Sequence, residues 1–310
     1  MEKRSRIYVA GHRGMAGSAI LGKLQDGGYR NIVARSHSEL DLENLEATIS
    51  FFESEQPEYV FFAAGLVGGI EYKREHPLDM LGKNLRMIMN VLEASCRCKV
   101  KGFLNIGSIL LYPKGGSEGF TEGEIGKTDL RGIDAPYTLA KLAGEKLCEY
   151  YRLQYGLPAI TVIPCNFFGE HAPIGSNKAG VIPALIERFD AAKERNEREV
   201  VVWGTGNACR EFLYSQDLAD ACIFVMENAK EEFVFNVGSG TEISIRDAAM
   251  TVKDVVGYQG SVVFDSGKPE GRMHMRLNSQ RINNLGWRAK TPFEAAVRNT
   301  YLWWKCGRQV

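Results

Sequence analysis

A tyrosine and a lysine stand four residues apart after Pro136, and together they could move a proton. If the run after Pro136 is helical, Tyr137 and Lys141 lie one above the other on one face of the helix. A phenol, with a pKa of about 10, is a poor acid–base group at neutral pH, but a cation beside it favours the phenolate. Such a pair can exchange a proton with a carbonyl or alcohol oxygen while a hydride moves at the carbon. An amphipathic helix with a surface lysine has the same spacing, so the interpretation depends on companion residues.

One companion is a serine at the end of an apolar run. Residues 102–106 predict a buried strand, and Ser108 follows it after one glycine. A serine in this place could simply cap a turn or a helix. At the carboxyl end of a strand, where open α/β sheets bind ligands, its hydroxyl is also placed to hydrogen-bond a substrate oxygen. We therefore expect Ser108, Tyr137 and Lys141 to form a catalytic group.

The other companion is a glycine-rich turn near the N-terminus, between a strand pattern at residues 6–10 and a helical pattern from Ser18. Its glycines permit a tight turn and let a pyrophosphate approach backbone N–H groups at a helix N-terminus. A flexible turn would also use glycines, but the strand before it and the helix after it favour a dinucleotide site. The residues assigned to that site are Gly11, Arg13, Gly14, Met15 and Gly17.

The residue at the end of the second predicted strand indicates whether the chain binds NAD or NADP(H). The apolar run at residues 31–34 ends at Arg35. An acidic residue there would accept hydrogen bonds from a ribose 2′-hydroxyl, whereas Arg35, together with Arg13, suits a 2′-phosphate. We therefore expect NADP(H) rather than NAD, although a solvated surface arginine is the plain alternative. Asp41 and Leu42 follow and could reach the adenine.

Strand and helix patterns alternate through the first half of the chain. A third strand at residues 59–63 runs into a small-residue loop, where cofactors lie in open α/β sheets. A long helix is predicted over residues 78–95, and a further buried strand over 159–164. This alternation predicts an α/β fold with a doubly wound parallel Rossmann sheet. The cofactor-binding residues assigned in this part are Ala63, Ala64 and Asn84.

The character of the sequence changes near Cys165. We expect an NADP-binding Rossmann domain over residues 1–165 and a smaller C-terminal α/β substrate domain over residues 166–310, with segments that cross back to the first. The elements predicted in the second part are a loop at 166–177, a helix at 181–194, strands at 199–203 and 234–237, and helices at 278–285 and 292–304. In the first part, the charged run at residues 122–131 is predicted to be the solvated edge of a lid.

Composition excludes several classes of function. The chain has 310 residues, a formal net charge of +0 and a pI near 7.0, so it has no electrostatic footprint for nucleic acid or an anionic membrane. No apolar run approaches the ~20 residues that span a bilayer, and we expect a cytoplasmic protein. The seven cysteines lack paired CxxC spacing and the five histidines form no HxxxH pattern, so we expect no metal site.

The glycine loop with His12 and Arg13, the serine and the Tyr137/Lys141 pair together resemble the extended short-chain dehydrogenase/reductases. Within that class, the chain is similar to the GDP-L-fucose synthase family, the GDP-4-keto-6-deoxymannose epimerase/reductases. The glycine loop and the Y-x-x-x-K pair mark only the broad class. More specific blocks are VIPAL at 181–185, WGTG at 203–206 and REFL at 210–213. Other matching blocks lie at residues 9–15, 67–70, 112–114, 136–144 and 268–271.

The resemblance implies NADPH as hydride donor and a nucleotide-linked 4-keto sugar, carrying GDP, as acceptor. Tyr137 would protonate the C4 oxygen, Lys141 would lower the Tyr137 pKa and bind the nicotinamide ribose, and Ser108 would hydrogen-bond the keto oxygen. The positions that match the family's nucleotide-sugar site are Asn166, Val181, Arg188, Trp203 and Arg210. Arginines suit a pyrophosphate, whereas Trp203 could also be a core aromatic.

Three positions depart from the family pattern. The family's epimerase chemistry uses a cysteine two residues after the serine and a histidine just before VIPAL, and this chain has Leu110 and Gly180 there. Epimerisation next to a ketone requires one group to remove the α-proton and another to return it on the opposite face, and neither residue can carry a proton. His171 and Cys165 are nearby substitutes, but proton transfer is demanding in geometry. The third position is Asn278, where the family has an aspartate. With this change the sequence does not identify the nucleotide base or the sugar.

Three functions follow from these residues. The first is an NADPH-dependent C4-ketoreductase of a GDP-linked 4-keto-6-deoxy sugar, without 3,5-epimerisation. The second is a bifunctional epimerase/reductase, and the third is a non-catalytic NADP-binding protein on the same fold. A lost Tyr137 or Lys141 would favour the third, and both are present. The resemblance also implies a homodimer through the helices predicted near residues 78–95 and 137–155.

Overall fold

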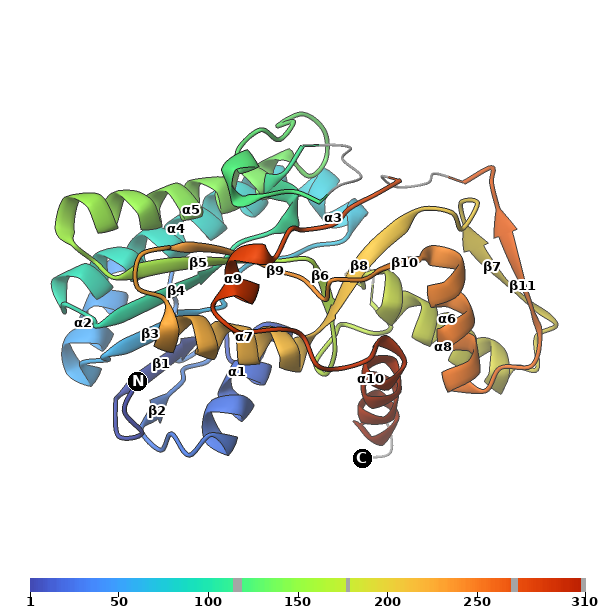
Figure 1. Cartoon of the computed structure of the whole chain (residues 1–310), viewed down its shortest axis with the longest axis horizontal. Helices are drawn as coiled ribbons and strands as arrows, with labels where there is room; N and C mark the ends of the chain where they lie inside the picture. The colour runs from blue at the N-terminus through green and yellow to red at the C-terminus, as the bar shows by residue number, and fades with distance from the viewer. Residues whose placement is uncertain (114–118, 177–178, 269–272, 308–310) are drawn as a thin grey trace.

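The chain folds into a larger and a smaller lobe (Figure 1). The computed structural model describes residues 1–113, 119–176, 179–268 and 273–307. Parts of two sequence blocks and of one predicted loop therefore lie outside the described residues: Lys114, residues 269–271 and Asn177.

A parallel sheet of six strands forms the centre of the larger lobe, in the order β2-β1-β3-β4-β5-β9. Its strands are β1 (Ile7–Ala10), β2 (Ile32–Val33), β3 (Tyr59–Phe62), β4 (Gly102–Ile106), β5 (Ala159–Pro164) and β9 (Val234–Val237). Every residue of β1, β4, β5 and β9 is buried. Continuous apolar runs of this kind belong to parallel strands that are covered on both faces. The predicted Rossmann sheet is confirmed.

Helices cover both faces of this sheet (Figure 1). On one face α1 packs against α7, and on the other α4 contacts both α2 and α5. These helices are α1 (Met15–Asp26), α2 (Leu45–Glu55), α4 (Pro77–Arg97), α5 (Ala135–Tyr155) and α7 (Ser215–Asn228). Leu24 and Val225 belong to the hydrophobic core on the first face, and Phe52 and Val91 to the core on the second. The sheet is therefore doubly wound, as predicted.

The smaller lobe is built around short strands. Strand β8 pairs in parallel with β6 and antiparallel with β10, and β7 pairs in parallel with β11. Helices α6, α8 and α10 pack against one another and against these strands. The elements are β6 (Asn166–Phe168), α6 (Val181–Glu194), β7 (Glu199–Trp203), β8 (Cys209–Tyr214), β10 (Glu242–Ser244), α8 (Ile245–Val256), β11 (Ser261–Asp265) and α10 (Phe293–Gly307). Phe189, Phe212 and Trp304 lie in its hydrophobic core.

The chain passes between the lobes more than once. After β8 it returns to the larger lobe, where α7 packs against the sheet and β9 pairs with β5. After β11 it returns again, and α9 (Gln280–Asn284) contacts β9. Residues 166–310 therefore contribute to both lobes, while the domain boundary at residue 165 stays a prediction.

One prediction about a loop is wrong at its start, and a second has an exception at one residue. The predicted loop at 166–177 begins with β6, because Asn166–Phe168 pairs in register with β8. In the charged run at 122–131, the Glu122 side chain is only 9% exposed. Its carboxylate accepts a hydrogen bond from the Asn236 backbone N–H at 2.9 Å and lies 3.9 Å from Arg281 Nε. Contacts with distant segments thus shield the Glu122 side chain, whereas the rest of the run is exposed or half-buried.

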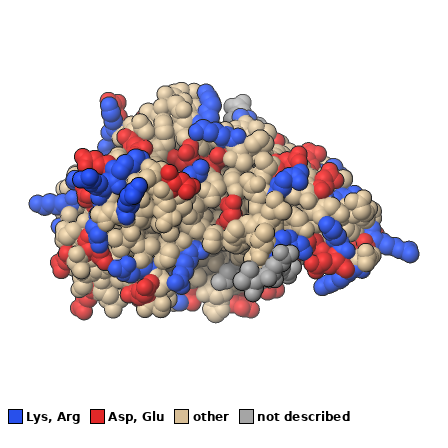
Figure 2. All heavy atoms as spheres, turned by 90° about the horizontal axis from the view of Figure 1, so that it is seen from below, with Lys and Arg blue, Asp and Glu red and all other residues tan. Residues whose placement is uncertain are grey.

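Charged side chains of both signs are interspersed over the face seen in Figure 2. Among the described residues, no helix has both the length and the apolar character needed to cross a membrane. The same residues contain no group of three or more His, Cys, Asp or Glu side chains placed to hold a metal ion.

Candidate active site

Helix α5 carries the tyrosine and the lysine. It begins at Ala135, and Pro136 in its first turn fixes a backbone conformation that suits a helix start. Tyr137 therefore lies in the first turn and Lys141 one turn later. Lys141 Nζ donates a hydrogen bond to the Ile106 carbonyl at 2.7 Å and lies 5.9 Å from the centre of the Tyr137 ring. The end of β4 thus holds the lysine close to the tyrosine.

Burial changes the acidity of both groups. It raises the pKa of Tyr137 to about 12 and lowers the pKa of Lys141 to about 8. The sequence predicts that Lys141 lowers the Tyr137 pKa, but in this structure the loss of solvent around the phenol is the larger effect. At neutral pH the site therefore contains a protonated phenol beside an ammonium group. That state suits the donation of a proton to a carbonyl oxygen.

Ser108 follows β4 and starts the 3₁₀ helix η1 (Ile109–Leu111). Its Oγ accepts a hydrogen bond from the Leu110 N–H at 3.2 Å, so the capping role considered for this serine is present. A hydroxyl that accepts one bond can still donate its own hydrogen. Because η1 contacts α5, this donor lies on the same side of the sheet as Tyr137.

Asn84 shapes the loop that follows β3. Its Oδ1 accepts from the Leu66 N–H at 2.8 Å, and its Nδ2 donates to the Leu66 carbonyl at 3.1 Å and to the Met80 carbonyl at 2.7 Å. A Cβ atom added at Gly65 would lie 3.9 Å from Lys141 Nζ. Asn84, predicted to bind the cofactor, thus uses its amide to place a backbone loop against Lys141.

The glycine loop fits a pyrophosphate. Gly11 has a φ of +80°, and a Cβ there would lie 2.7 Å from Ala64 Cα, so the loop packs against the Ala63–Ala64 backbone. At Gly17 a Cβ would lie 2.1 Å from the Gly11 carbonyl oxygen. Gly14 precedes α1 without any side-chain cap, so the N–H groups of the first turn remain for a ligand. Such a helix N-terminus is a ready anion site.

Cations gather where a 2′-phosphate would lie. Arg35 Nη2 lies 2.6 Å from Glu55 Oε1, and its guanidinium lies 5.6 Å from the centre of the Phe51 ring. Glu55 also pairs with Arg6, so one carboxylate faces two arginines. Arg13 in the glycine loop is exposed. The excess positive charge fits an additional phosphate.

The two residues predicted to reach the adenine differ in exposure. Asp41 is exposed and its Oδ1 accepts from the Glu43 N–H at 2.9 Å. The Leu42 side chain is buried in the core, so only its backbone is left for a ligand. Sequence reasoning did not assign His12, whose Nδ1 is buried without a hydrogen-bond partner among the described residues. Its place inside the glycine loop is the signal that could have suggested it.

A second group of predicted residues lies in the smaller lobe. Arg188 on α6 donates from Nη1 to the Val201 carbonyl at 3.1 Å, and its guanidinium lies 5.8 Å from the centre of the Trp203 ring. Trp203 is 52% exposed, which excludes the core role considered for it. Lys268 Nζ lies 5.9 Å from the same ring. Lys268 begins the family block at residues 268–271, but the sequence alone assigned this lysine no role.

The remaining predicted substrate residues lie at the starts of elements in the smaller lobe. Asn166 begins β6 directly after β5, and its Nδ2 is buried without a hydrogen-bond partner in the described part of the chain. Val181 is 42% exposed at the start of α6. Arg210 on β8 is half-buried and donates from Nη1 to the Cys209 carbonyl at 2.6 Å. A buried amide donor without a partner is a group that a ligand oxygen would satisfy.

Leu110 and Gly180, which replace the family's epimerase cysteine and histidine, differ in their surroundings. Leu110 packs against the large hydrophobic core, and its carbonyl accepts from Thr128 Oγ1 at 2.9 Å. Gly180 precedes α6 with a φ of −75°, and a Cβ there would meet no atom within 4 Å. Neither the backbone nor the available space therefore requires glycine at position 180.

The two substitutes considered for proton transfer are poorly placed. Cys165 is 2% exposed, and burial raises the pKa of its thiol well above the ordinary value. His171 is exposed, and its ring lies tilted by 41° against Trp303 of α10, with ring centres 4.8 Å apart. Cys165 would thus be hard to ionise, and the His171 ring contacts the C-terminal helix.

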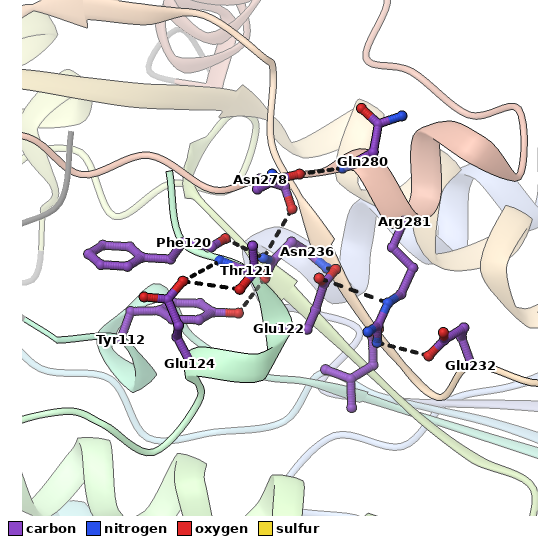
Figure 3. Close-up of polar contacts among 11 residues, drawn as sticks. Tyr112, Phe120, Thr121, Glu122, Glu124, Glu232, Asn236, Asn278, Gln280 and Arg281 are labelled. Atoms are coloured by element: carbon purple, nitrogen blue, oxygen red, sulfur yellow. Dashed lines mark hydrogen bonds and ion pairs between the residues drawn. The ribbon is translucent and has the colours of Figure 1, made fainter. Parts of the chain in front are cut away.

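Asn278 belongs to a polar network that joins three distant segments (Figure 3). Its Oδ1 accepts from the Gln280 N–H at 2.9 Å, and its carbonyl accepts from Asn236 Nδ2 at 3.2 Å. Asn236 also accepts from the Tyr112 hydroxyl at 2.6 Å and donates to the Phe120 carbonyl at 2.8 Å. The network fixes the chain just after η1, and Asn278 has a structural contact at the position where the family has aspartate.

With this geometry, comparison with known proteins defines the class. Residues 7–238 match the model of the NAD dependent epimerase/dehydratase family, and the chain belongs to this family of extended short-chain dehydrogenase/reductases. The predicted class, an enzyme family that uses NAD(P), is thereby confirmed.

One relative in sequence and two solved structures are similar to this chain over nearly its whole length. The GDP-L-fucose synthase of Escherichia coli (strain K12) is 40% identical over 309 residues, which cover 97% of this chain and 96% of that protein. A GDP-6-OMe-4-keto-L-xylo-heptose reductase from C. jejuni has a similar structure, with a TM-score of 0.92, 33% identity and 99% coverage of each chain. The NADP-bound GDP-mannoheptose C4 reductase MlghC from Campylobacter jejuni has a TM-score of 0.88 and 34% identity, covering 98% of this chain and 99% of that one.

Proposed function

We propose that this protein is an NADPH-dependent C4-ketoreductase of a GDP-linked 4-keto-6-deoxy sugar, and that it does not epimerise C3 or C5. The observation that carries the proposal is that Ser108, Tyr137 and Lys141 are present while the positions of the family's epimerase cysteine and histidine hold Leu110 and Gly180. Relatives whose names include GDP-sugar reductases and a GDP-L-fucose synthase support the GDP-linked substrate. MlghC with bound NADP supports the cofactor, as does the excess of arginine beside Glu55.

The chemistry assigns one role to each residue. When bound, NADPH supplies the hydride that reaches C4. Ser108 donates a hydrogen bond to the ketone oxygen and orients it. Tyr137 transfers its phenolic proton to that oxygen as negative charge develops there, and the Lys141 ammonium stabilises the resulting phenolate. The phenolate then takes a proton from solvent, so ketone, NADPH and one proton give secondary alcohol and NADP⁺.

Epimerisation would need two further proton carriers beside the sugar. Leu110 has none, and Gly180 has no side chain. Cys165 is buried with a raised pKa, and the His171 ring contacts Trp303. These four observations favour a simple reductase over a bifunctional epimerase/reductase, which the 40% identity to the E. coli enzyme keeps as the second candidate.

The test is an NMR time course in deuterated water with NADPH and GDP-4-keto-6-deoxymannose. We expect reduction at C4 without deuterium at C3 or C5, and the E. coli GDP-L-fucose synthase serves as the comparison enzyme. Deuterium at either carbon would contradict the proposal and favour the bifunctional enzyme. NADPH binding without turnover of any GDP-linked 4-keto sugar would favour the non-catalytic alternative.

The proposal includes a homodimer formed through α4 and α5. These two helices carry large apolar side chains that are exposed: Met89 (50%), Leu139 (40%), Tyr150 (55%) and Leu153 (75%). An exposed apolar patch on the surface of a protein marks a site of protein–protein contact. Sedimentation equilibrium should give a dimer for the native protein and a monomer for Leu153→Glu, and a native monomer would exclude this arrangement.

A further inference from the structure

A second lysine lies beside Tyr137. Lys73 Nζ is 5.9 Å from the centre of the Tyr137 ring, the same distance as Lys141 Nζ. Lys141 comes from the same helix as the tyrosine, whereas Lys73 comes from α3 (Ile70–Glu75). Nothing in the Y-x-x-x-K spacing indicates this second cation, which only the fold brings to the site.

An ion pair holds Lys73 in place. Its Nζ lies 2.8 Å from Asp134 Oδ1, and Asp134 directly precedes α5. The Lys73 side chain is 17% exposed and the Asp134 side chain 48% exposed. The better-shielded partner is thus the cation, and the carboxylate is partly solvated. The pair connects α3 to the turn that carries Tyr137.

Lys73 also borders an open cleft at this end of α5. The cleft measures about 510 Å³ and is lined by Lys73, Arg74, Pro77, Gly132, Ile133 and Pro136. Arg74 is exposed there. Charged side chains at the Tyr137 end of α5 include Lys73, Arg74, Asp134 and Lys141. Three of these four are cations and one is an anion, a balance that opposes the effect of burial on the phenol.

We infer that Lys73 is a positioning residue for the proposed reduction, which acts through Tyr137 by adding a second cation that stabilises the phenolate left after proton transfer. The inference rests on the proposed function for its catalytic meaning. Its physical content is that the phenol of Tyr137 responds to the charge of Lys73 and, with the opposite sign, to the charge of Asp134. If the ion pair only stabilised the fold, removing Lys73 or removing Asp134 would change the titration of Tyr137 in the same direction.

The experiment titrates the phenol directly. The protein is labelled with 3-fluorotyrosine, whose phenol is more acidic than that of tyrosine, and saturated with NADP⁺. Its ¹⁹F NMR spectrum is followed with pH, and Tyr137→Phe identifies the resonance. We expect Lys73→Met to raise the Tyr137 pKa by about one unit and Lys73→Arg to leave it close to native. Asp134→Asn should lower it by about half a unit, because removing the carboxylate leaves the cations less opposed.

A matched control separates this effect from a general loss of charge. Lys83→Met removes an exposed lysine on α4 that lies 3.8 Å from Asp79, and it should leave the Tyr137 titration unchanged. Equal shifts in Lys73→Met and Asp134→Asn, or no shift in either, would overturn the inference. Because the titration needs no turnover, its outcome is independent of whether GDP-4-keto sugars are reduced. If they are reduced, Lys73→Met should lower kcat and leave the KM for the sugar unchanged.

Discussion

The two lobes present their functional side chains in opposite ways. In the larger lobe, burial shifts the pKa of Tyr137 upward and that of Lys141 downward. In the smaller lobe, Trp203 is 52% exposed and Arg188 is exposed beside it. Proton transfer needs groups whose protonation is set before the substrate arrives, whereas a recognition surface loses its water when the ligand binds. Variants of Tyr137 and Lys141 in the larger lobe should therefore change kcat, and variants of Arg188 and Trp203 in the smaller lobe should change the KM for the sugar nucleotide.

Removing the phenolic hydroxyl gives the largest expected effect. Tyr137→Phe should lower kcat by about 10²- to 10⁴-fold, the range in which a general acid contributes, because the C4 oxygen then has no proton donor. Stopped-flow measurement of NADPH oxidation with saturating sugar nucleotide checks this value. NADPH affinity, measured by fluorescence titration, should remain within about twofold of native, since the glycine loop is untouched. An unchanged kcat in this variant would contradict the proton-donor role proposed for Tyr137.

Alkaline pH gives the next largest effect. Burial lowers the Lys141 pKa from 10.5 to about 8, so the ammonium loses its proton as the pH rises through that value. The value of kcat/KM for NADPH, which reports the free enzyme, should then fall by about tenfold per unit above pH 8. Lys141→Arg, whose guanidinium stays charged, should lack this alkaline limb. A flat profile up to pH 10 in the native protein would mean that the charge of Lys141 is not required.

Most of the larger lobe could be predicted from sequence because its strands are continuous apolar runs. Strands β4, β5 and β9 have the predicted limits. In the same lobe, chemistry-bearing residues at strand ends converge because the carboxyl ends of parallel strands meet at one edge. In the second half of the chain, helix α6 and strand β7 also have the predicted limits.

The remaining features depend on pairing between segments far apart in the chain. The three residues of β6 form a strand because β8 lies beside them, and β-propensity is set largely by such neighbours. The Glu122 side chain is largely shielded from solvent because Asn236, more than 100 residues later, donates to its carboxylate. Lys73 reaches Tyr137 only because α3 and α5 adjoin through the Asp134 ion pair. No local pattern carries this information.

In the smaller lobe, the largest expected effect comes from Trp203. Trp203→Ala should raise the KM for the GDP-sugar by about tenfold, because stacking of a base or sugar on an aromatic ring contributes about 1–3 kcal/mol. The kcat should stay within about twofold of native, since the proton donor lies in the other lobe. Steady-state kinetics with varied sugar nucleotide check both values. A matched control is Trp303→Ala, which removes an aromatic side chain that contacts His171.

The smallest expected effect concerns the choice between cofactors. Arg35→Ala should reduce the preference for NADPH over NADH by about fivefold, because one charge-assisted contact to the 2′-phosphate is lost. Glu55→Gln should act in the opposite direction, since the carboxylate that faces Arg35 and Arg6 is then neutral. The ratio of kcat/KM for the two cofactors checks both variants. Opposite changes in this ratio would assign the discrimination to charge at the end of β2, whereas parallel changes would mean that the Arg35–Glu55 pair only maintains local structure.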